Sequence, residues 1–392
     1  MSVADLPDPR TWPANPSVTA GPTAGNASSR AAELHRVVAS ALESTTSRDE
    51  ALLNAEAVRT IATWMSEDAA GLANAFAAAP SVAVARHLWR LLAGIERGTP
   101  GKVETLHTTL FAIPIILVAA LDRLSAPVVL PGAIAQAHSL EDLLRDADEF
   151  AGAKTFALSS ALAGADALDV HALPRLLARN VLHEGDVTGA PAVDVEPKPI
   201  VVDTPSERVH LRFALGAVLT VPHAEPLANT SIAQWGIPFA ELLARDLRAP
   251  RVSLLALPRP AERLVGALLT GRAARREVAA QLFASNAVRK FRASVGEPYA
   301  VISAHRCADA TGGGEIRLSL SSPFAAREAE GFRCPMYPYE PVHDVAAMLV
   351  TLLRDCRVEH IEVRDGIHPD ADPVTGGPLL FKGGDAAGRS LH

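Results

Sequence analysis

The sequence feature that most constrains the fold is an uninterrupted apolar run at residues 110–121, Leu-Phe-Ala-Ile-Pro-Ile-Ile-Leu-Val-Ala-Ala-Leu. It ends at the charged pair Asp122 and Arg123, short of the roughly 20 apolar residues that a membrane-spanning helix needs. Runs of this kind are typical of strands buried on both faces or of core helices. β-branched residues favour a strand over residues 107–118. Pro114 indicates an edge, a bulge or a break, and a helix beginning at Pro114 is the alternative.

The composition allows a sizeable core and several domains. The chain has 392 residues, of which 48% are hydrophobic, and its formal net charge is −7. This charge argues against a broad nucleic-acid-binding surface. The odd number of cysteines, without CxxC spacing, argues against a disulfide framework or a structural zinc site. No signal-peptide core follows Met1, so we expect a cytoplasmic protein without a membrane span.

The first hundred residues divide into a tail and a helical region. Residues 1–30 are rich in Pro, Ala, Ser, Thr and Gly without periodicity, which predicts a disordered tail. Residues 31–99 show four amphipathic helical patterns separated by short loops, which predicts a helical layer. Gly98 and Pro100 end the last of these patterns.

Residues 184–207 contain four prolines and a series of acidic residues, which predicts a linker or a long surface loop. It separates a first α/β unit, residues 100–183, from a second, residues 208–272, whose last helix is expected to begin at Pro260 and to end at Gly271. The second opens on the clearest strand pattern of the chain, in which every odd position from Val209 to Val221 is apolar.

The two α/β units resemble each other at nearly constant spacing. The matched segments are 107–117 with 209–219, 140–147 with 240–247, and 155–158 with 252–255. This order predicts two β-α-β-α units related by duplication, with parallel strands. Phe111 and Phe213 would then occupy equivalent buried positions. Chance similarity in a chain rich in alanine and leucine is the alternative.

The remaining sequence predicts a C-terminal α+β segment, residues 273–364. It comprises a basic helix, a hairpin, a second helix and a last strand, at residues 273–294, 299–321, 342–353 and 358–363. The β-β-α-β run resembles part of a ferredoxin-like unit, an arrangement that hosts many functions and implies none. Residues 365–392, rich in Pro and Gly, predict a flexible tail. The fold class is therefore α/β.

Two groups of residues are candidate binding sites. Imidazole and carboxylate ligands suit Zn²⁺, Mn²⁺ or Mg²⁺, and they gather at His360, Glu362, Asp365 and His368. The spacing matches no known metal motif, and a solvated strand end is the simpler interpretation. Arginines cluster where a helix is expected to begin, which predicts an anion site; they are Arg272, Arg275 and Arg276. Solvated arginines at a turn between helices are the alternative.

Two further patterns are weaker. His305 and Cys307 would share one strand face, as a base and a thiol nucleophile do, but a lone cysteine is more typical of a small buried hydrophobe. Three glycines at 312–314 suit a hairpin turn better than a phosphate loop, because no helix follows them.

The absence of a convincing catalytic set favours a non-enzymatic binding, assembly or regulatory protein that acts on protein partners, whether itself or others. The first alternative is a metal-assisted hydrolase or phosphoesterase using the cluster at residues 360–372, in which Asp370 and Asp372 follow the four residues named above. The second is an accessory component of a phage or conjugative element. The sequence indicates no particular cofactor and no catalytic residue.

Overall fold

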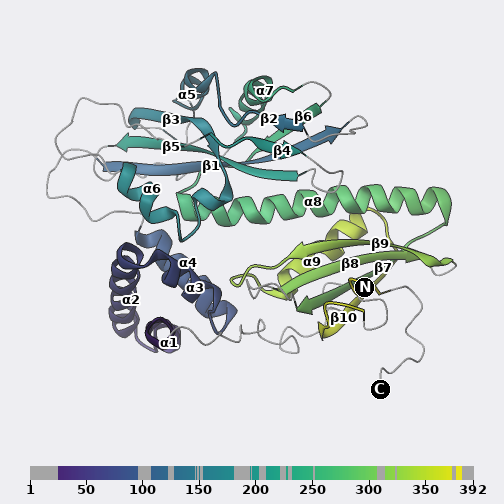
Figure 1. Ribbon diagram of the computed structural model, residues 1–392, viewed down its shortest axis with the longest axis horizontal. Coiled ribbons are helices and arrows are strands. Elements are labelled where there is room, and N and C mark those ends of the chain that lie inside the picture. Colours follow the sequence, from purple (N-terminus) through teal and green to yellow (C-terminus); the bar gives the residue numbers. More distant parts are fainter. Residues whose placement is uncertain are drawn as a thin grey trace. The chain divides into compact units, whose positions relative to one another are not determined.

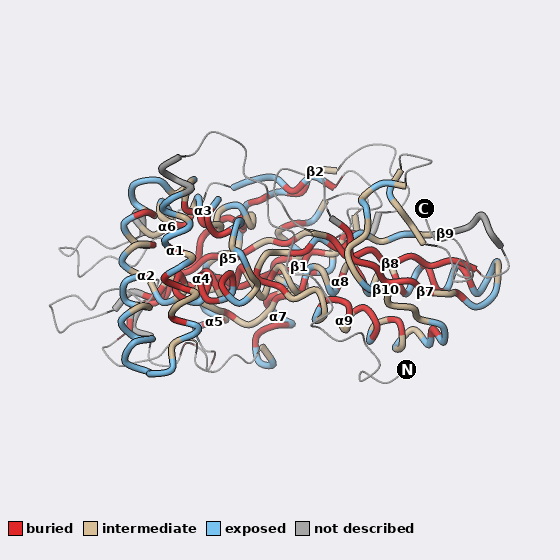
Figure 2. The backbone as a smooth tube through the Cα atoms, turned by 90° about the horizontal axis from the view of Figure 1, so that it is seen from below, coloured by how far each residue is buried: buried red, intermediate tan, exposed pale blue. Residues whose placement is uncertain are grey.

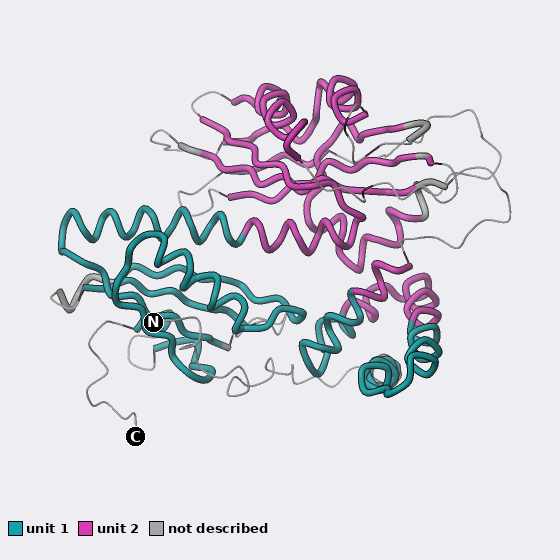
Figure 3. The backbone as a smooth tube through the Cα atoms, turned by 180° about the vertical axis from the view of Figure 1, so that it is seen from behind, with its two compact units in different colours: residues 1–57, 74–89, 276–392 teal, residues 58–73, 90–275 magenta. Residues whose placement is uncertain are grey.

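A computed structural model places the elements of the chain as drawn in Figure 1. It describes residues 25–95, 107–121, 128–145, 147, 150, 153–180, 195, 197–202, 209–220, 227, 232–249, 252–306, 314–322, 325–372 and 377–381. The chain divides into two compact units (Figure 3). Unit 1 comprises residues 1–57, 74–89 and 276–392, and unit 2 comprises residues 58–73 and 90–275.

The four predicted N-terminal helices are present. They are α1 (Gly25–Glu43), α2 (Ser47–Glu67), α3 (Ala69–Ala77) and α4 (Val82–Ile95). Thr46 caps α2, because its hydroxyl accepts a hydrogen bond from the Asp49 amide at 3.1 Å. The helices do not form one separate layer, since both units include parts of them. Helix α1 begins at Gly25, within the expected disordered tail, and residues 1–24 lie outside the described residues.

Unit 2 is built on a four-stranded sheet. Its strands are β1 (His107–Leu121), β3 (Ala153–Ala163), β5 (Val209–Thr220) and β6 (Val252–Pro258), in the order β3-β5-β1-β6. The apolar run therefore lies in a central strand, and the alternative helix at Pro114 is wrong. Figure 2 shows buried backbone along β1 and β5. Every neighbouring pair is antiparallel, so the parallel strands expected within each unit are not adjacent.

The order of elements nevertheless repeats. Strands β1 and β3 are both antiparallel to β5, so they run in the same direction with β5 between them. Strands β5 and β6 likewise flank β1. Helix α5 (Ala137–Arg145) connects the first pair and α7 (Gly236–Asp246) the second. This is the split β-α-β, ferredoxin-like arrangement, and it lies here rather than in the C-terminal segment.

The duplication itself is not confirmed. Helices α5 and α7 contribute Leu140, Leu144, Phe239 and Leu243 to one core, together with Phe111, as expected if both pack on the same face. Phe213, however, faces the opposite side of the sheet. Its cross-strand partner is Pro114, whereas that of Phe111 is Gly216, and successive residues of a strand point to opposite faces. Phe111 and Phe213 are therefore both buried but not equivalent.

Pro114 lies in the central strand at the point where its neighbour β6 ends. The Ala112 amide donates to the Glu262 carbonyl at 2.8 Å, and the Arg259 amide donates to the Pro114 carbonyl at 2.8 Å. Pro114 has no amide proton with which to return a hydrogen bond to this segment. Strand β6 ends at Pro258, so the missing hydrogen bond falls just beyond the regular ladder, where a proline is tolerated.

Helix α8 (Leu264–Ser294) is continuous, so the predicted stop at Gly271 is wrong. Gly271 allows close packing of α8 on the sheet instead. A Cβ atom at this position would lie 3.0 Å from Leu211 and 3.1 Å from Phe213. The helix crosses the division of the chain, because residues up to Arg275 belong to unit 2 and residues from Arg276 to unit 1.

Two smaller regions complete the described part of unit 2. Helix α6 (Leu173–Asn180) follows β3, where a helix was expected. Strands β2 (Val128–Leu130) and β4 (Ile200–Val202) form a two-stranded sheet. Strand β4 falls within the predicted linker, yet Ile200 and Val202 are fully buried. The short apolar Ile-Val-Val run favours a buried strand more strongly than the preceding prolines at residues 197–199 disfavour it.

Unit 1 contains a second sheet. Its strands are β7 (Tyr299–Arg306), β8 (Gly314–Ser322), β9 (Ala325–Pro335) and β10 (His360–His368), in the order β10-β7-β8-β9. The first three in sequence are antiparallel neighbours, and β10 is parallel to β7. One face packs on α8 and α9 (Val342–Asp355) in a core that includes Ile302, Leu318 and Leu349. The predicted hairpin, helix and last strand are present, and β9 was not predicted.

Candidate functional site

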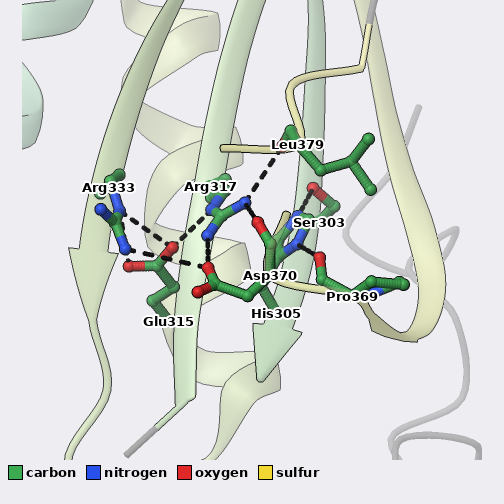
Figure 4. Close-up of polar contacts among 8 residues, drawn as sticks. All are labelled: Ser303, His305, Glu315, Arg317, Arg333, Pro369, Asp370 and Leu379. Atoms are coloured by element: carbon green, nitrogen blue, oxygen red, sulfur yellow. Dashed lines mark hydrogen bonds and ion pairs between the residues drawn. The ribbon is translucent and has the colours of Figure 1, made fainter. Parts of the chain in front are cut away.

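The face of the unit 1 sheet turned away from α8 and α9 carries polar residues. Ile302 and Leu318 point into the helical core, so Ser303 and Arg317, one position earlier or later, point to the other side. The cross-strand pairs on that side are Ser303 with Arg317, His305 with Glu315, and Arg317 with Arg333. The strand pairing thus brings polar side chains of β7, β8 and β9 into one cluster (Figure 4).

The chain after β10 covers this cluster. We call residues 369–372 and 377–381 the C-terminal strap. Its two segments are joined by a bridge between Ala371 and Pro378, by the Asp372 amide donating to the Gly377 carbonyl at 2.8 Å, and by the Leu379 amide donating to the Asp370 carbonyl at 3.2 Å. This ordered arrangement differs from the expectation of a flexible tail beginning at Asp365.

Arg317 is the centre of the cluster and has no exposed side-chain surface. Its guanidinium donates to the carboxylates of Glu315 and Asp370 and to the main-chain carbonyls of Asp370 and Leu379. Arg333 donates to both Glu315 oxygens at 2.9 and 3.0 Å. Two guanidiniums thus meet two carboxylates. A buried charge needs such compensation, because removing it from water is costly.

His305 holds the strap at a second point. Its Nδ1 lies 2.8 Å from the Pro369 carbonyl and its Nε2 lies 2.8 Å from the Ser303 hydroxyl. A carbonyl only accepts, so Nδ1 carries the proton and Nε2 accepts from Ser303. Burial lowers the pKa of His305 to about 4, although the bond to Pro369 opposes this shift. The neighbouring Arg317 and His368 charges also lower this pKa, so the ring is neutral at pH 7.

Ser303, His305 and the Pro369 carbonyl have the order of a nucleophile, a base and a group that orients the base. Both side chains are only 1% exposed, so a substrate would reach the hydroxyl only after the strap had left. The arrangement therefore links polar groups to the strap rather than presenting them to solvent. The other predicted nucleophile, Cys307, lies outside the described residues.

The four predicted metal ligands have different surroundings and do not converge on one point. Glu362 accepts from the Tyr299 hydroxyl at 3.0 Å and pairs with Arg364 at 2.9 Å. The His360 ring stacks on Tyr299, whereas His368 packs on Phe381 with a centroid distance of 4.9 Å. Asp365 is exposed. Within the described ranges, no three His, Cys, Asp or Glu side chains come together as metal ligands.

The pairing of β10 with β7 accounts for this separation. Glu362 pairs with Val301, whereas His368 pairs with His305, four residues further along β7. The two side chains therefore share a face of the sheet but lie about 13 Å apart along it, at the usual rise of a strand. The pairing is irregular between Val363 and Ile367, where Gly366 has a φ of 81°, a conformation that favours glycine.

The three predicted anion-binding arginines lie in the middle of α8, so the expected helix start with its free amides is wrong. The Arg275 Nε donates to the Val209 carbonyl at 3.0 Å. Arg276 forms an ion pair with Glu340 in which both side chains are about one-tenth exposed. Arg272 is half-buried. Of the predicted glycine turn, only Gly314 is described, and it begins β8.

Unit 2 contains a cavity of about 430 Å³ lined largely by acidic residues at the ends of α2 and α6. Its carboxylates have local partners. Asp68 accepts from the Gly71 amide at 2.8 Å, Asp169 accepts from the His171 amide at 3.0 Å, and Asp166 pairs with a lysine at 2.6 Å. These contacts cap turns and helices, so the cavity is a weaker candidate than the cluster around Arg317.

No protein family, no curated protein and no solved structure matches the chain. Over the described ranges, no helix is long and apolar enough to cross a membrane. The site must therefore be argued from its own geometry. Sequence reasoning did not single out Ser303, Glu315 or Arg317, and it considered Asp370 only as a member of the acidic and histidine cluster at residues 360–372. The available signal was the alternation in β7 and β8, where polar residues recur at every second position opposite an apolar face.

Proposed function

We propose that the protein is a non-enzymatic binding or assembly protein of the cytoplasm, and that the polar face of the unit 1 sheet is its binding surface. This proposal rests on the contacts that the Arg317 and His305 side chains make. Between them they contact three main-chain carbonyls and one carboxylate of an extended segment, the strap. Such contacts recognise a backbone, whereas a catalytic group needs access to a reacting atom.

The experiment must distinguish this proposal from its alternative, a metal-dependent hydrolase. The protein, purified without chelator, would be analysed for Zn, Mn and Mg and assayed against a generic phosphoester with each metal added. We expect less than 0.1 equivalent of metal, which is an order-of-magnitude threshold for a site that is not a metal centre, and no metal-dependent turnover. A metal bound at one equivalent and lost in His368→Ala, together with turnover, would overturn the proposal.

A positive test uses binding itself. The purified protein would be used to capture a library of random extended peptides, and His138→Ala would be the matched control because His138 is an exposed histidine of α5. We expect saturable binding that is lost in Arg317→Met and kept in His138→Ala. Binding that survives Arg317→Met would show that the unit 1 face is not the surface used.

A further inference from the structure

We propose that the unit 1 face recognises an extended protein segment in which a main-chain carbonyl is followed directly by an aspartate, and that the strap is a built-in competitor for it. This inference rests on the proposed function and names its partner class. In the strap, the carbonyl belongs to Pro369 and the carboxylate to Asp370, and they bind His305 and Arg317 respectively.

The need for a carboxylate follows from the charges of the sheet. Arg317 and Arg333 bring two positive charges, and Glu315 supplies one negative charge that both arginines share. The sheet is therefore one negative charge short. Asp370 supplies it from the strap, at the position that Arg317 reaches. A competing segment must bring the same charge, because the single carboxylate of Glu315 cannot compensate both guanidiniums while Arg317 stays buried.

The site has a second, apolar part beside the carboxylate. Gly331 of β9 leaves room for a leucine, since a Cβ at this position would lie 2.6 Å from the Leu380 side chain. Phe381 follows, with its ring against His368 and His305 and with the Arg364 guanidinium 3.9 Å from its centre. The face thus takes a carboxylate and, next to it, a Leu-Phe pair.

The way the strap is held suits displacement. The main-chain hydrogen bonds described within it join its own two segments, and Arg317 and His305 attach it to the sheet through side chains. A partner can therefore replace the strap without opening the β7-β8-β9 ladder. The strap is tethered to β10, so its effective concentration is in the millimolar range, as for short linkers. The native chain should bind a competitor only weakly.

The experiment measures binding of a labelled peptide with the sequence of residues 368–381 to the full-length protein by fluorescence anisotropy. In Asp370→Asn the strap loses its charge and competes less well, so we expect the peptide to bind at least roughly tenfold more tightly than to the wild type, as for the loss of one charge-assisted hydrogen bond. The same peptide with Asn in place of its Asp should bind Asp370→Asn at least roughly tenfold more weakly. Arg289→Met, which changes an exposed arginine of α8, is the matched control and should behave as the wild type.

Hydrogen exchange of the strap amides shows whether Asp370→Asn has released the strap from the sheet. If these amides exchange faster in Asp370→Asn and the peptide still fails to bind, the proposal is overturned, although the proposed binding function can still hold through other peptides. Equal binding of the Asp and Asn peptides overturns it too. If light scattering shows Asp370→Asn to be a dimer that excludes the peptide, the occupant is a second copy and the proposal of a separate partner fails. Arg333→Met, whose side chain is half exposed, replaces Arg317→Met if the latter does not fold, and it should weaken peptide binding.

Discussion

Arg317 contacts Asp370 twice, through the carboxylate and through the main-chain carbonyl, although 53 residues separate them in sequence. The carboxylate contact requires an acidic side chain at position 370, whereas the carbonyl contact requires only that the main chain passes Arg317. Replacing Asp370 therefore removes only the charged contact of this pair, whereas replacing Arg317 removes both contacts. The pair offers a way to measure separately how charge and backbone contribute to holding the strap.

Arg317→Met should destabilise the protein by roughly 3–5 kcal/mol, because it leaves Glu315 and Asp370 without their shared buried partner. Asp370→Asn should cost less, since Asp370 is about one-third exposed and keeps its carbonyl contact. Urea unfolding of the two single variants and the double variant forms a cycle. A coupling energy near zero would show that the two residues contribute independently, contrary to this expectation.

Stability should decrease as the pH falls from about 6.5 to about 4, partly through His305. The pKa of His305 in the folded protein, about 4, lies below its ordinary value of 6.5, so the unfolded chain binds the proton more readily. The full stability is present above the ordinary value and is lost progressively towards the folded value, by about 3 kcal/mol at most. Urea unfolding at a series of pH values measures this slope.

His305→Gln is the control for the pH experiment, because it removes the titrating ring. The variant should be less stable than the wild type at pH 7 and should show a shallower slope between pH 6.5 and 4. Some slope should remain, since burial also lowers the pKa of His368. Identical slopes in both proteins would contradict the assigned role of His305.

Ile116→Asp should prevent unit 2 from folding. Ile116 is fully buried in the central strand, and an unpaired carboxylate there costs several kcal/mol, comparable to the stability of a domain. Leu255→Asp on β6 is the matched control, because Leu255 is 56% exposed and should tolerate the change. Soluble expression and circular dichroism distinguish the two. A folded Ile116→Asp protein with an unchanged melting temperature would refute the central position of β1.

Gly216→Val should destabilise unit 2 by roughly 1–3 kcal/mol or more through overpacking. A Cβ at Gly216 would lie 2.1 Å from the Phe111 ring, which itself packs on Phe150 and Phe156. Phe111→Leu should partly restore the stability of Gly216→Val, although it is destabilising alone. Thermal unfolding of the three variants checks this, and an additive double variant would mean that the two positions do not compete for space.

Local patterns predicted the elements well and their partners poorly. The run at 110–121 and the alternation after Val209 are properties of a single segment, so both strands could be recognised. Their antiparallel pairing depends on contacts between residues about 100 positions apart in the sequence. A strand-helix-strand order fits an arrangement in which the two strands are adjacent as well as one in which a third strand lies between them. Gly271 was misread because its close contacts with Leu211 and Phe213, which favour an uninterrupted helix, are invisible in sequence.

The candidate site was missed for a related reason. Arg317 and Glu315 gave no recognisable motif, and Asp370 stood in a Pro- and Gly-rich stretch that predicted a loose tail. Only the folded sheet brings the arginine to the strap. The metal hypothesis placed weight on residues that are close in sequence, but the strand pairing places Glu362 opposite Val301 and His368 opposite His305, four residues apart along β7.

Pro114 also has a consequence for how β1 and β6 choose their alignment. A shift of β6 by one residue would turn every side chain to the opposite face. A shift by two residues would preserve the faces but extend β6 opposite Pro114, where a carbonyl would find no donor. An unsatisfied buried carbonyl costs about 1–3 kcal/mol. The proline thus acts as a register mark, which disfavours a two-residue shift of β6 towards it, one of the misalignments that hydrophobic patterning alone would permit.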